Sequence, residues 1–383
     1  MERSQRPALE DELLALLALT LVPGLGSASV RALRERHGSA VGALAAAPEG
    51  WSGLPCRRVA SELAGNADLR AAQRELERAA RIGAWLLHDG DPRYPEHWRS
   101  FSELPPLLYV RGAWPDGLQS WPPAAVAVVG SRRASTAAVT FSFDLGNALA
   151  RAGAVVVSGL AYGVDAAAHE GALAAASAGA PALAVVASGV DRPGPAGNAP
   201  LARAILAAGG AVLSEAPIGH TPARGDFPRR NRLVAALARA VVVVAAGEAS
   251  GAHLTAGHAA RFGRDVFVCP AHPWDEHMAG NLALLRDGAA PLCSVAEAPT
   301  LLGFSGGPHE GAHDALPARV PSELVWAWEA LSRSPLVLDE LVARSNRGVA
   351  ETLVALERLV ALGACEVDGS RRYRRQPTAV NGS

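Results

Sequence analysis

Six apolar runs alternate with alanine-rich stretches between residues 124 and 271, and this alternation constrains the fold more than any other feature. Runs that are apolar throughout, and not only at every second position, are typical of strands buried on both faces of a parallel sheet. The pattern therefore predicts a Rossmann-like α/β domain, with a doubly wound, mostly parallel sheet covered by helices on both faces. The expected strands are Ala125–Gly130, Ala154–Gly159, Ala182–Ser188, Ala211–Glu215, Ala240–Ala246 and Asp265–Ala271.

The residues before this domain have the apolar spacing of helices and few β-branched runs. They contain a Gly24-Leu25-Gly26 turn that resembles a helix-hairpin-helix (SAM-like) element, whose backbone amides can face a DNA phosphate. A purely structural role for the turn is the alternative.

The residues after the domain begin with a stretch rich in Gly, Pro and His that reads as a linker. Three helices around 321–332, 338–345 and 349–363 follow, and then a hairpin over 364–373 with Asp-Gly as its turn, which together indicate a winged helix. The expected organisation is a helical N-terminal domain 1–98, a Rossmann-like DNA-binding domain 99–303, a linker 304–320, a winged helix 321–376 and a tail 377–383.

The charged residues show what chemistry the chain lacks. The formal net charge is −1, so any site for a polyanion must be a local cluster of cations. All 36 basic side chains are arginines, which excludes a Walker-A lysine, a Schiff-base lysine and a lysine general base. Strong cationic contacts to phosphate must come from the planar arginine fork.

Cysteine spacing and the apolar run near the start indicate the compartment. The four cysteines are scattered without a C-x-x-C pair, which fits a reducing cytoplasm and neither a disulfide framework nor a zinc ribbon. The apolar run Leu13–Val22 is too short to span a bilayer, and it follows three acidic residues where a signal peptide would carry positive charge. We expect a cytoplasmic protein without a membrane partner.

The loop after the first predicted strand contains Gly130, Ser131 and Arg132 and runs into a helix. In an open α/β sheet, ligands bind beyond the carboxyl ends of the strands, and a helix N-terminus there attracts anions. Arg132 adds a bidentate phosphate ligand. A capped turn with an exposed arginine is the alternative.

Because the dinucleotide fingerprint G-x-G-x-x-G is missing, we expect neither NAD nor FAD, and no other cofactor.

The second strand ends in Ser158-Gly159, and Asp165 and His169 follow four residues apart, so they share one helix face. A catalytic pair is one interpretation. The favoured one is an acid that stabilises the start of the helix and a histidine buried in an interface. We therefore predict no catalytic residue and no enzymatic activity.

Before the fifth strand, five arginines and one acid lie between residues 224 and 239. Phe227 is expected to offer a stacking surface for a base while Arg230 and Arg232 neutralise phosphates, as in proteins that bind single strands. After the fifth strand, Ser250, Gly251 and Thr255 again combine small residues, a hydroxyl and a helix start. These loops together favour a groove for a polyanion.

His309-Glu-Gly-Ala-His313 matches the zinc-protease pattern H-E-x-x-H. That chemistry needs both histidines on one face of a rigid helix, whereas this segment lies between Gly306-Gly-Pro308 and Pro317. We predict that no metal binds there.

Ordered motifs from about Asp91 to Ala290 resemble the DNA-processing protein A family (DprA, also called Smf). The motifs are Asp91-Pro-Arg-Tyr-Pro95, Leu104-Pro-Pro-Leu-Leu-Tyr-Val-Arg-Gly112, Gly130-Ser-Arg132, Ser158-Gly-Leu-Ala-x-Gly-Val-Asp165 with His169, Ser214-Glu215, Phe227-Pro-x-Arg-Asn-Arg232, and Ser250-Gly251 with Thr255.

The resemblance implies a homodimer that binds incoming single-stranded DNA in natural transformation and loads the RecA recombinase onto it, with single-strand-binding protein as a further partner. It carries over as DNA-groove residues Gly130, Ser131, Arg132, Arg230, Asn231 and Arg232. Ser158, Gly159, Asn198, Phe227, Ser250, Gly251 and Thr255 complete the expected DNA-binding set.

The chain departs from the family pattern at three places. Ala196 stands near the position of a usual basic residue, Ala245-Ala246 end a strand where an acid is common, and Ala271 replaces a usual glycine. Two other functions are weighed against DNA binding. One is a nucleotide hydrolase of the phosphoribohydrolase type, whose Pro-Gly-Gly-x-Gly-Thr loop and catalytic glutamate are not found here. The other is a transcriptional regulator that acts through the winged helix.

Overall fold

The computed structural model describes residues 6–46, 49–54, 67–120, 123–175, 182–248, 250–304, 319–331, 336–368 and 371–375. The chain divides into two compact units, Met1–Gly307 and Pro308–Ser383. The first unit contains a nine-stranded sheet in the order β1-β2-β6-β5-β4-β3-β7-β8-β9. The strands from β6 to β9 pair in parallel, whereas β1 and β2 add an antiparallel edge.

All six predicted strands are present, which confirms the doubly wound α/β fold. The central strands have every residue buried, as expected for strands covered on both faces. The strands are β3 (Ala125–Val129), β4 (Val155–Ser158), β5 (Ala182–Val185), β6 (Ala211–Ser214), β7 (Ala240–Val243), β8 (Asp265–Val268) and β9 (Ala290–Pro291).

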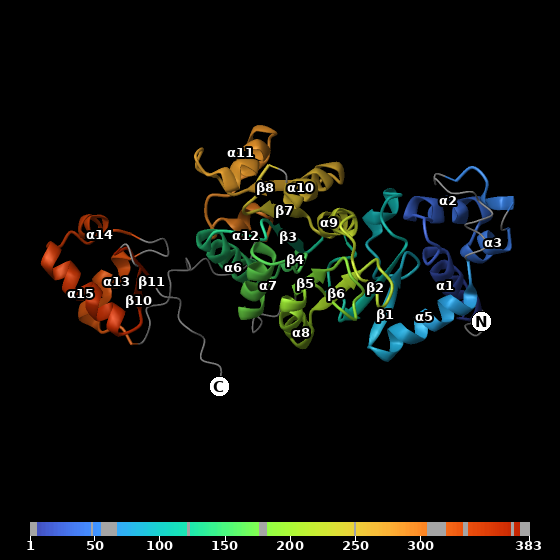
Figure 1. The fold of residues 1–383 in the computed structure, drawn as a ribbon, viewed down its shortest axis with the longest axis horizontal. Coiled ribbons are helices and arrows are strands. Elements are labelled where there is room, and N and C mark those ends of the chain that lie inside the picture. Colours follow the sequence, from blue (N-terminus) through green and yellow to red (C-terminus); the bar gives the residue numbers. More distant parts are fainter. Residues whose placement is uncertain are drawn as a thin grey trace. The chain divides into compact units, whose positions relative to one another are not determined.

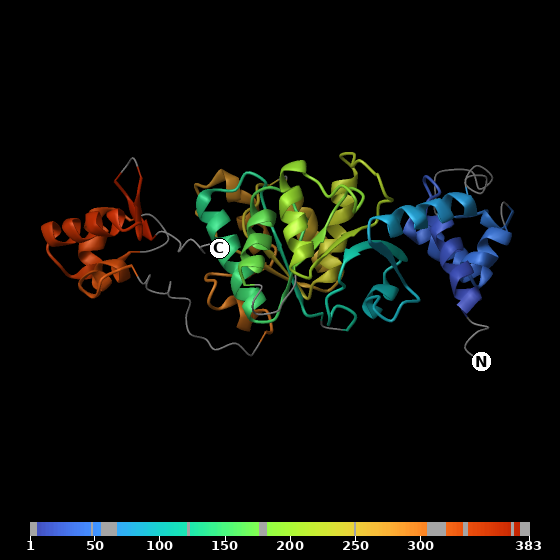
Figure 2. The ribbon, with the colours of Figure 1, turned by 90° about the horizontal axis from the view of Figure 1, so that it is seen from below.

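Successive residues of these strands point into two different cores. Val126, Val128 and Val156 pack in one core with the apolar residues of α6, α7 and α8, while Ala127 and Val129 pack in the other with α9 and α10. Figure 1 shows the two groups of helices on opposite sides of the strands, and Figure 2 gives the view from below. The helices are α6 (Thr136–Arg151), α7 (Val164–Ala174), α8 (Ala199–Ala207), α9 (Asp226–Leu237), α10 (Gly251–Arg261), α11 (Ala279–Arg286) and α12 (Ala298–Leu301), with short 3-10 turns η4 (Ala196–Asn198) and η5 (Glu276–Met278).

The described elements of the N-terminal segment up to Arg81 are helices, but the residues after Arg81 correct the sequence prediction. Residues 84–88 form a strand that pairs with β2, so the helical pattern expected up to about residue 98 fails there. A short apolar run does not distinguish a strand from a buried helical turn. The elements are α1 (Arg6–Thr20), α2 (Ser27–His37), α3 (Ala40–Ala45), η1 (Glu49–Trp51), α5 (Leu69–Arg81), β1 (Ala84–His88), η2 (Glu96–Ser100) and β2 (Leu107–Gly112).

The second unit has the three helices and hairpin of a winged helix around its own apolar core, which includes Trp328, Leu341 and Leu356. Leu336 forms an isolated antiparallel bridge to Tyr373 and so joins the segment before the second helix of this unit to the hairpin. The elements are η6 (Ser322–Leu324), α13 (Val325–Ala330), α14 (Leu338–Ser345), α15 (Val349–Ala361), β10 (Cys365–Val367) and β11 (Tyr373–Arg375).

Across the described ranges, no helix is both long and apolar enough to cross a membrane. His309 and His313, the residues of the zinc-protease pattern, lie outside the described residues.

Candidate nucleic-acid interface

The order of the strands places a switch point between β3 and β7. From β3 the chain adds β4, β5 and β6 on one side, and β7 then pairs with the other side of β3. Loops that leave two such strands diverge and open a crevice at their carboxyl ends, where open α/β sheets bind ligands. Here the Ser131 amide donates to the Ala245 carbonyl at 2.7 Å, so the loop after β3 is held against the end of β7. Gly130 and Ser131 therefore lie at the predicted edge.

The loop after β4 packs directly on the loop after β3. Gly163 has φ of 75°, a conformation that favours glycine, and a Cβ there would lie 3.0 Å from the carbonyl carbon and oxygen of Arg132. The Val164 amide also donates to the Ser131 carbonyl at 3.3 Å. The backbones of the two loops are thus fixed relative to each other.

Arg132 and Phe227 meet above this edge. The Arg132 side chain is exposed, and its Cζ lies 4.9 Å from the centroid of the Phe227 ring. Phe227 belongs to the first turn of α9 and is half-buried. A cation stacked on an aromatic face keeps its outer N–H groups available for phosphate. The structure therefore brings together two residues that lie almost a hundred positions apart in the sequence.

Arg230 has a different environment from the one predicted. It lies in the second turn of α9, is only 7% exposed, and donates through Nη1 to the Gly159 carbonyl at 2.5 Å and to the Val185 carbonyl. Burial lowers the pKa of Arg230, and the nearby Asp165 carboxylate opposes this shift. Its guanidinium group ties α9 to the carboxyl ends of β4 and β5, beneath the surface on which Arg132 lies.

Asp165 completes this buried group. Its Oδ2 accepts from the amides of Gly159 at 3.1 Å and Ala161 at 3.3 Å, and Ser158 donates from its hydroxyl to the Val128 carbonyl at 2.6 Å. Burial raises the pKa of Asp165, while the charge of Arg230 lowers it. Ser158, Gly159 and Asp165 are therefore part of the interior that shapes the loop.

Asp165 and His169 do not form a hydrogen-bonded pair. His169 is fully buried, and within the described ranges neither ring nitrogen has a hydrogen-bond partner of good geometry. Burial lowers the pKa of His169 to about 4, so the ring is neutral at physiological pH. This environment fits the favoured interpretation of a histidine packed in an interface.

Arg232 is also internal. It is 7% exposed, and its Nη2 contacts Glu215 Oε2 at 2.5 Å. The Glu215 carboxylate also accepts hydrogen bonds from the exposed Arg229 at 2.7 Å and from the Ser27 hydroxyl at 3.2 Å. Burial lowers the pKa of Arg232, and Glu215 opposes this shift. Arg230 and Arg232, which were expected to neutralise phosphates, are therefore bonded to groups of the protein itself, Arg230 to carbonyls and Arg232 to a carboxylate.

The residues after β7 lie beside α9. Asn231 Nδ2 donates to the Gly251 carbonyl at 3.1 Å, and Thr255 Oγ1 donates to the same carbonyl at 3.1 Å. Ser250 is the N-cap residue of α10, but its hydroxyl makes no capping hydrogen bond. Asn231 and Thr255 therefore position the start of α10. Ser250 and Gly251 are the residues of this loop that best fit the predicted contact with a polyanion.

The loops after β5 and β4 are also linked. Asn198 Nδ2 donates to the Leu160 carbonyl at 2.9 Å, which places this predicted residue beside the loop after β4. Next to it, Tyr162 is 49% exposed. Tyr162 was not among the sequence-predicted site residues. The sequence offered one signal for it, because Tyr162 follows the predicted strand Ala154–Gly159 by three residues and so belongs to a loop at the carboxyl edge of the sheet.

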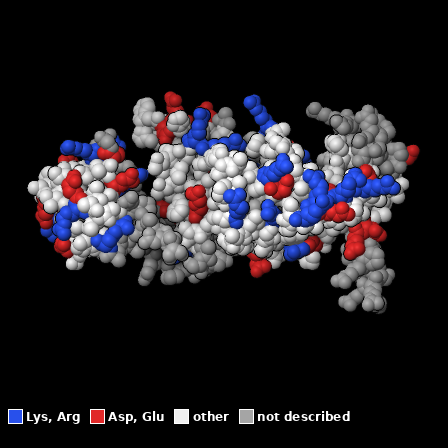
Figure 3. Space-filling view, turned by 60° about the horizontal axis from the view of Figure 1, so that its bottom comes forward, with Lys and Arg blue, Asp and Glu red and all other residues white. Residues whose placement is uncertain are grey.

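Basic side chains elsewhere on the first unit are mixed with acidic ones. On the face in Figure 3, blue side chains gather over the part of the unit where α5 lies. Two of the α5 arginines have acidic partners, Arg74 with Asp68 at 3.6 Å and Arg78 with Glu75 at 3.0 Å. This mixture agrees with the small net charge of the chain.

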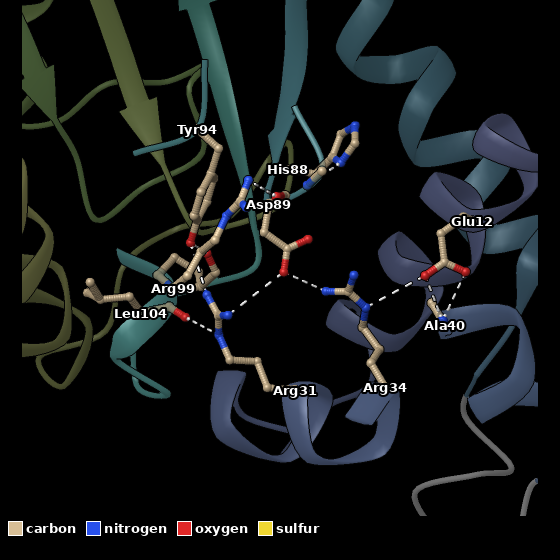
Figure 4. Close-up of polar contacts among 11 residues, drawn as sticks. Glu12, Arg31, Arg34, Ala40, His88, Asp89, Tyr94, Arg99 and Leu104 are labelled. Carbon is tan, nitrogen blue, oxygen red and sulfur yellow. Dashed lines mark hydrogen bonds and ion pairs between the residues drawn. The ribbon is translucent and has the colours of Figure 1, made fainter. Parts of the chain in front are cut away.

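The helix-hairpin-helix-like turn leads into α2, whose arginines face the rest of the unit. Figure 4 shows Arg31 and Arg34 converging on Asp89, at 3.8 Å and 2.6 Å. Arg31 also donates to the hydroxyl of Tyr94 at 3.0 Å and to the Leu104 carbonyl at 3.2 Å. These contacts attach α2 to the segment after β1, so they support the structural interpretation of the turn.

Taken together, the fold and this edge define a doubly wound α/β protein whose switch-point loops carry an exposed cation stacked on an aromatic ring. Residues 85–302 match the family described as DNA recombination-mediator protein A. The chain belongs to this family.

Curated relatives extend the match beyond those residues. The chain is 31% identical over 332 residues to Protein Smf of Synechocystis, covering 79% of this chain and 82% of the relative. It is 36% identical over 329 residues to the putative DNA processing protein DprA of Mycobacterium tuberculosis, with the same coverage of both chains.

Two solved structures have a similar fold. The DNA processing protein A structure from Streptococcus pneumoniae matches with a TM-score of 0.62 and 28% identity, over 78% of this chain and 99% of that one. A structure of DNA processing protein A from Helicobacter pylori, described for its single-stranded DNA binding mode, matches with a TM-score of 0.51 and 28% identity, over 58% and 97%.

Proposed function

We propose that this protein binds single-stranded DNA along the carboxyl edge of its sheet and delivers it to a RecA-type recombinase. The stacked pair of Arg132 and Phe227 is the observation that carries the proposal. A single strand offers phosphates and unpaired bases side by side, and single-strand binders combine cationic grooves with aromatic faces. The Helicobacter pylori relative, described for its single-stranded DNA binding mode, supports the same ligand for this chain.

The proposed contacts divide into two groups. Gly130, Ser131, Arg132, Phe227, Ser250 and Gly251 lie in the loops or first helical turn at the edge and are proposed to meet DNA directly. Ser158, Gly159, Asn198, Arg230, Asn231, Arg232 and Thr255 are proposed to hold those loops in place, because their described polar groups bond within the protein.

The winged helix is proposed to contribute little to DNA binding. Its third helix, α15, exposes Val349, Leu353 and Val354, and its arginine, Arg358, pairs with Glu323 at 3.0 Å. A helix that reads DNA needs polar or basic side chains toward the groove.

The hairpin of the winged helix has four arginines, and two of them have internal partners. Arg374 pairs with Glu366 at 2.8 Å, and Arg375 stacks on Trp328 while donating to the Trp328 carbonyl. The other two, Arg371 and Arg372, are exposed, so any contact of the hairpin with DNA is proposed to come from them. This makes the transcriptional-regulator alternative weaker.

Family membership supports the finer parts of the proposal, which are a homodimer in the cytoplasm, RecA loading during natural transformation, and single-strand-binding protein as a further partner. These parts are tested by asking whether the protein speeds strand exchange by RecA on DNA coated with single-strand-binding protein.

We expect this 383-residue chain to prefer single strands over duplexes and to ignore mononucleotides. Unpaired bases can stack on aromatic rings, whereas bases in a duplex cannot, and a mononucleotide offers too few phosphates. Filter binding with a single-stranded oligonucleotide, its duplex and a mononucleotide, at one salt concentration, measures this. Equal affinity for the duplex, or tighter binding of the mononucleotide, would contradict the proposal and favour the regulator or the nucleotide hydrolase.

Arg132→Ala is expected to weaken single-strand binding by about 1–3 kcal/mol with little dependence on base sequence, because it removes a charge-assisted contact to phosphate. The slope of log affinity against log salt should fall by about 0.7 for the loss of one phosphate contact on a single strand. Arg151→Ala is the matched control, since Arg151 is exposed in the last turn of α6, at the opposite edge of the sheet. A folded Arg132→Ala variant with unchanged affinity and slope would remove Arg132 from the interface.

A further inference from the structure

We propose that Tyr162 forms a second base-stacking subsite, which takes one unpaired nucleobase in the loop that adjoins the loop of Arg132. The proposal rests on the proposed function and adds to it a subsite and its ligand class. It starts from an exposed aromatic ring at the carboxyl end of β4, within the loop that packs on Arg132. Three further observations support it.

The first is that the loop carrying Tyr162 is held rigidly in an unusual conformation. Leu160 is fully buried and has φ of 58°, which side chains other than glycine rarely adopt. Its carbonyl accepts from Asn198, and the amides on either side of it, of Gly159 and Ala161, both donate to Asp165. Residues in such backbone conformations persist only where surrounding contacts fix them, and they are frequent at ligand sites. The position of the Tyr162 backbone is therefore fixed before any ligand arrives.

The second is that one side of the ring lies against backbone while much of its surface is open. A Cβ at Gly197 would lie 2.6 Å from the Tyr162 hydroxyl oxygen and 3.1 Å from Cε1, so the phenol ring packs closely against the backbone of Gly197. Tyr162 as a whole is still 49% exposed, although burying a ring of this size would be favourable. A ring supported on one side and open on the other is suited to stacking with a flat ligand.

The third is that the loop carrying Tyr162 adjoins the loop that carries Arg132. The backbone of Arg132 contacts Gly163, the neighbour of Tyr162, and its guanidinium group covers Phe227. Two adjoining loops and the start of α9 thus supply one cation and two aromatic rings. These are the groups that phosphates and bases of a single strand bind. Because every base has a π face, such a subsite would be tolerant of base identity.

Tyr162→Leu tests the subsite when two oligonucleotides of equal length are compared, one of thymidines and one entirely abasic. The substitution should lower affinity for oligothymidine by about 5- to 150-fold, the range of one base–aromatic stack. Its effect on the abasic strand should be less than about twofold, since the phosphates are unchanged. Tyr162→Phe, which keeps the ring, should bind both strands as the wild type does. Phe143→Leu on α6, where Phe143 is 37% exposed, is the matched control for losing a surface aromatic.

The outcomes separate the subsite from the function on which it rests. If Arg132→Ala weakens both strands while Tyr162→Leu weakens neither, the interface stands and the subsite is wrong. Equal weakening of both strands by Tyr162→Leu would also overturn it, because the ring would then act on the loop and not on a base. If the wild type binds neither strand, the proposed function fails and the subsite fails with it. The thermal midpoint of Tyr162→Leu should match that of the wild type, since the side chain is half exposed.

Discussion

Replacing Arg230 with methionine is expected to lower the free energy of unfolding by about 3–5 kcal/mol, the range for removing one of two opposite charges that are buried near each other. Methionine keeps much of the length of the side chain, so the loss comes from charge and hydrogen bonds more than from a cavity. Without Arg230, the carbonyls of Gly159 and Val185 lose a donor, and the buried Asp165 carboxylate loses the positive charge that opposes its desolvation. Denaturant unfolding followed by circular dichroism measures the difference.

The loss in the free energy of unfolding caused by Arg230→Met should depend on pH. Burial already raises the pKa of Asp165 above its unfolded value, and removing Arg230 raises it further. Between the unfolded and folded pKa values the native state then binds more protons than the unfolded state, so stability falls as pH rises through that window. His169 has an effect of the same sign. Burial, and to a smaller extent the charge of Arg230, lower the pKa of His169, so removing Arg230 raises this pKa and makes the folded variant bind protons more readily at low pH. The difference in the free energy of unfolding between the wild type and Arg230→Met should therefore be smaller at pH 5 than at pH 7.5.

Arg229→Met is the matched control. Arg229 lies one residue away but is exposed, and its ion pair with Glu215 is worth about 0–1 kcal/mol. Pairing Arg230→Met with Asp165→Leu should recover part of the lost stability, since no isolated charge is then left buried. If Arg230→Met is as stable as Arg229→Met, the guanidinium group does not hold the loops together, and the division of the site into contact and support residues is wrong.

The sequence predicted the sheet well because the strands are buried on both faces, and continuous apolar runs record that burial directly. All six expected strands were found within their predicted bounds. The antiparallel edge was missed, since Ala84–His88 is a short apolar run next to a helix, and its partner β2 lies beyond an irregular segment. Local pattern carries no information about which distant strand will pair.

The candidate site was predicted less completely, and α9 shows why. The segment Phe227-Pro-Arg-Arg-Asn-Arg232 reads as a run of exposed charge, but the helix begins at Asp226. Arg230 then reaches the ends of β4 and β5, while Arg232 reaches Glu215 beyond β6. Whether an arginine faces solvent or a carboxylate is decided by tertiary packing, which residue type and spacing do not encode. Arg132 and Phe227 could be named from the sequence, but their contact could not.

Removing Arg132 and Phe227 together is expected to cause the largest loss of single-strand affinity, about 2–5 kcal/mol or roughly 30- to several thousand-fold. Phe227→Ala alone should cost about 1–3 kcal/mol if one base stacks on the ring. The two losses should not add, because the two side chains contact each other, with Arg132 Cζ 4.9 Å from the ring centroid. A cation–π contact is worth about 0.5–1 kcal/mol at an exposed site, and the coupling in the double-mutant cycle should be of that size.

The size of that coupling identifies what Phe227 does. If the ring mainly orients Arg132 toward phosphate, then Phe227→Ala should weaken binding little once Arg132 is already alanine, and the double variant should resemble Arg132→Ala. If the ring stacks a base, Phe227→Ala should still cost most of its own amount in the Arg132→Ala background, and only on strands that carry bases. We expect the second result, because Phe227 is half-buried at a helix start that Arg230 and Arg232 fix from below, and its position does not require the stacked arginine. Titrations of the four proteins against oligothymidine and an abasic strand of the same length distinguish the two cases. Full additivity on oligothymidine would contradict the contact between the two side chains in solution.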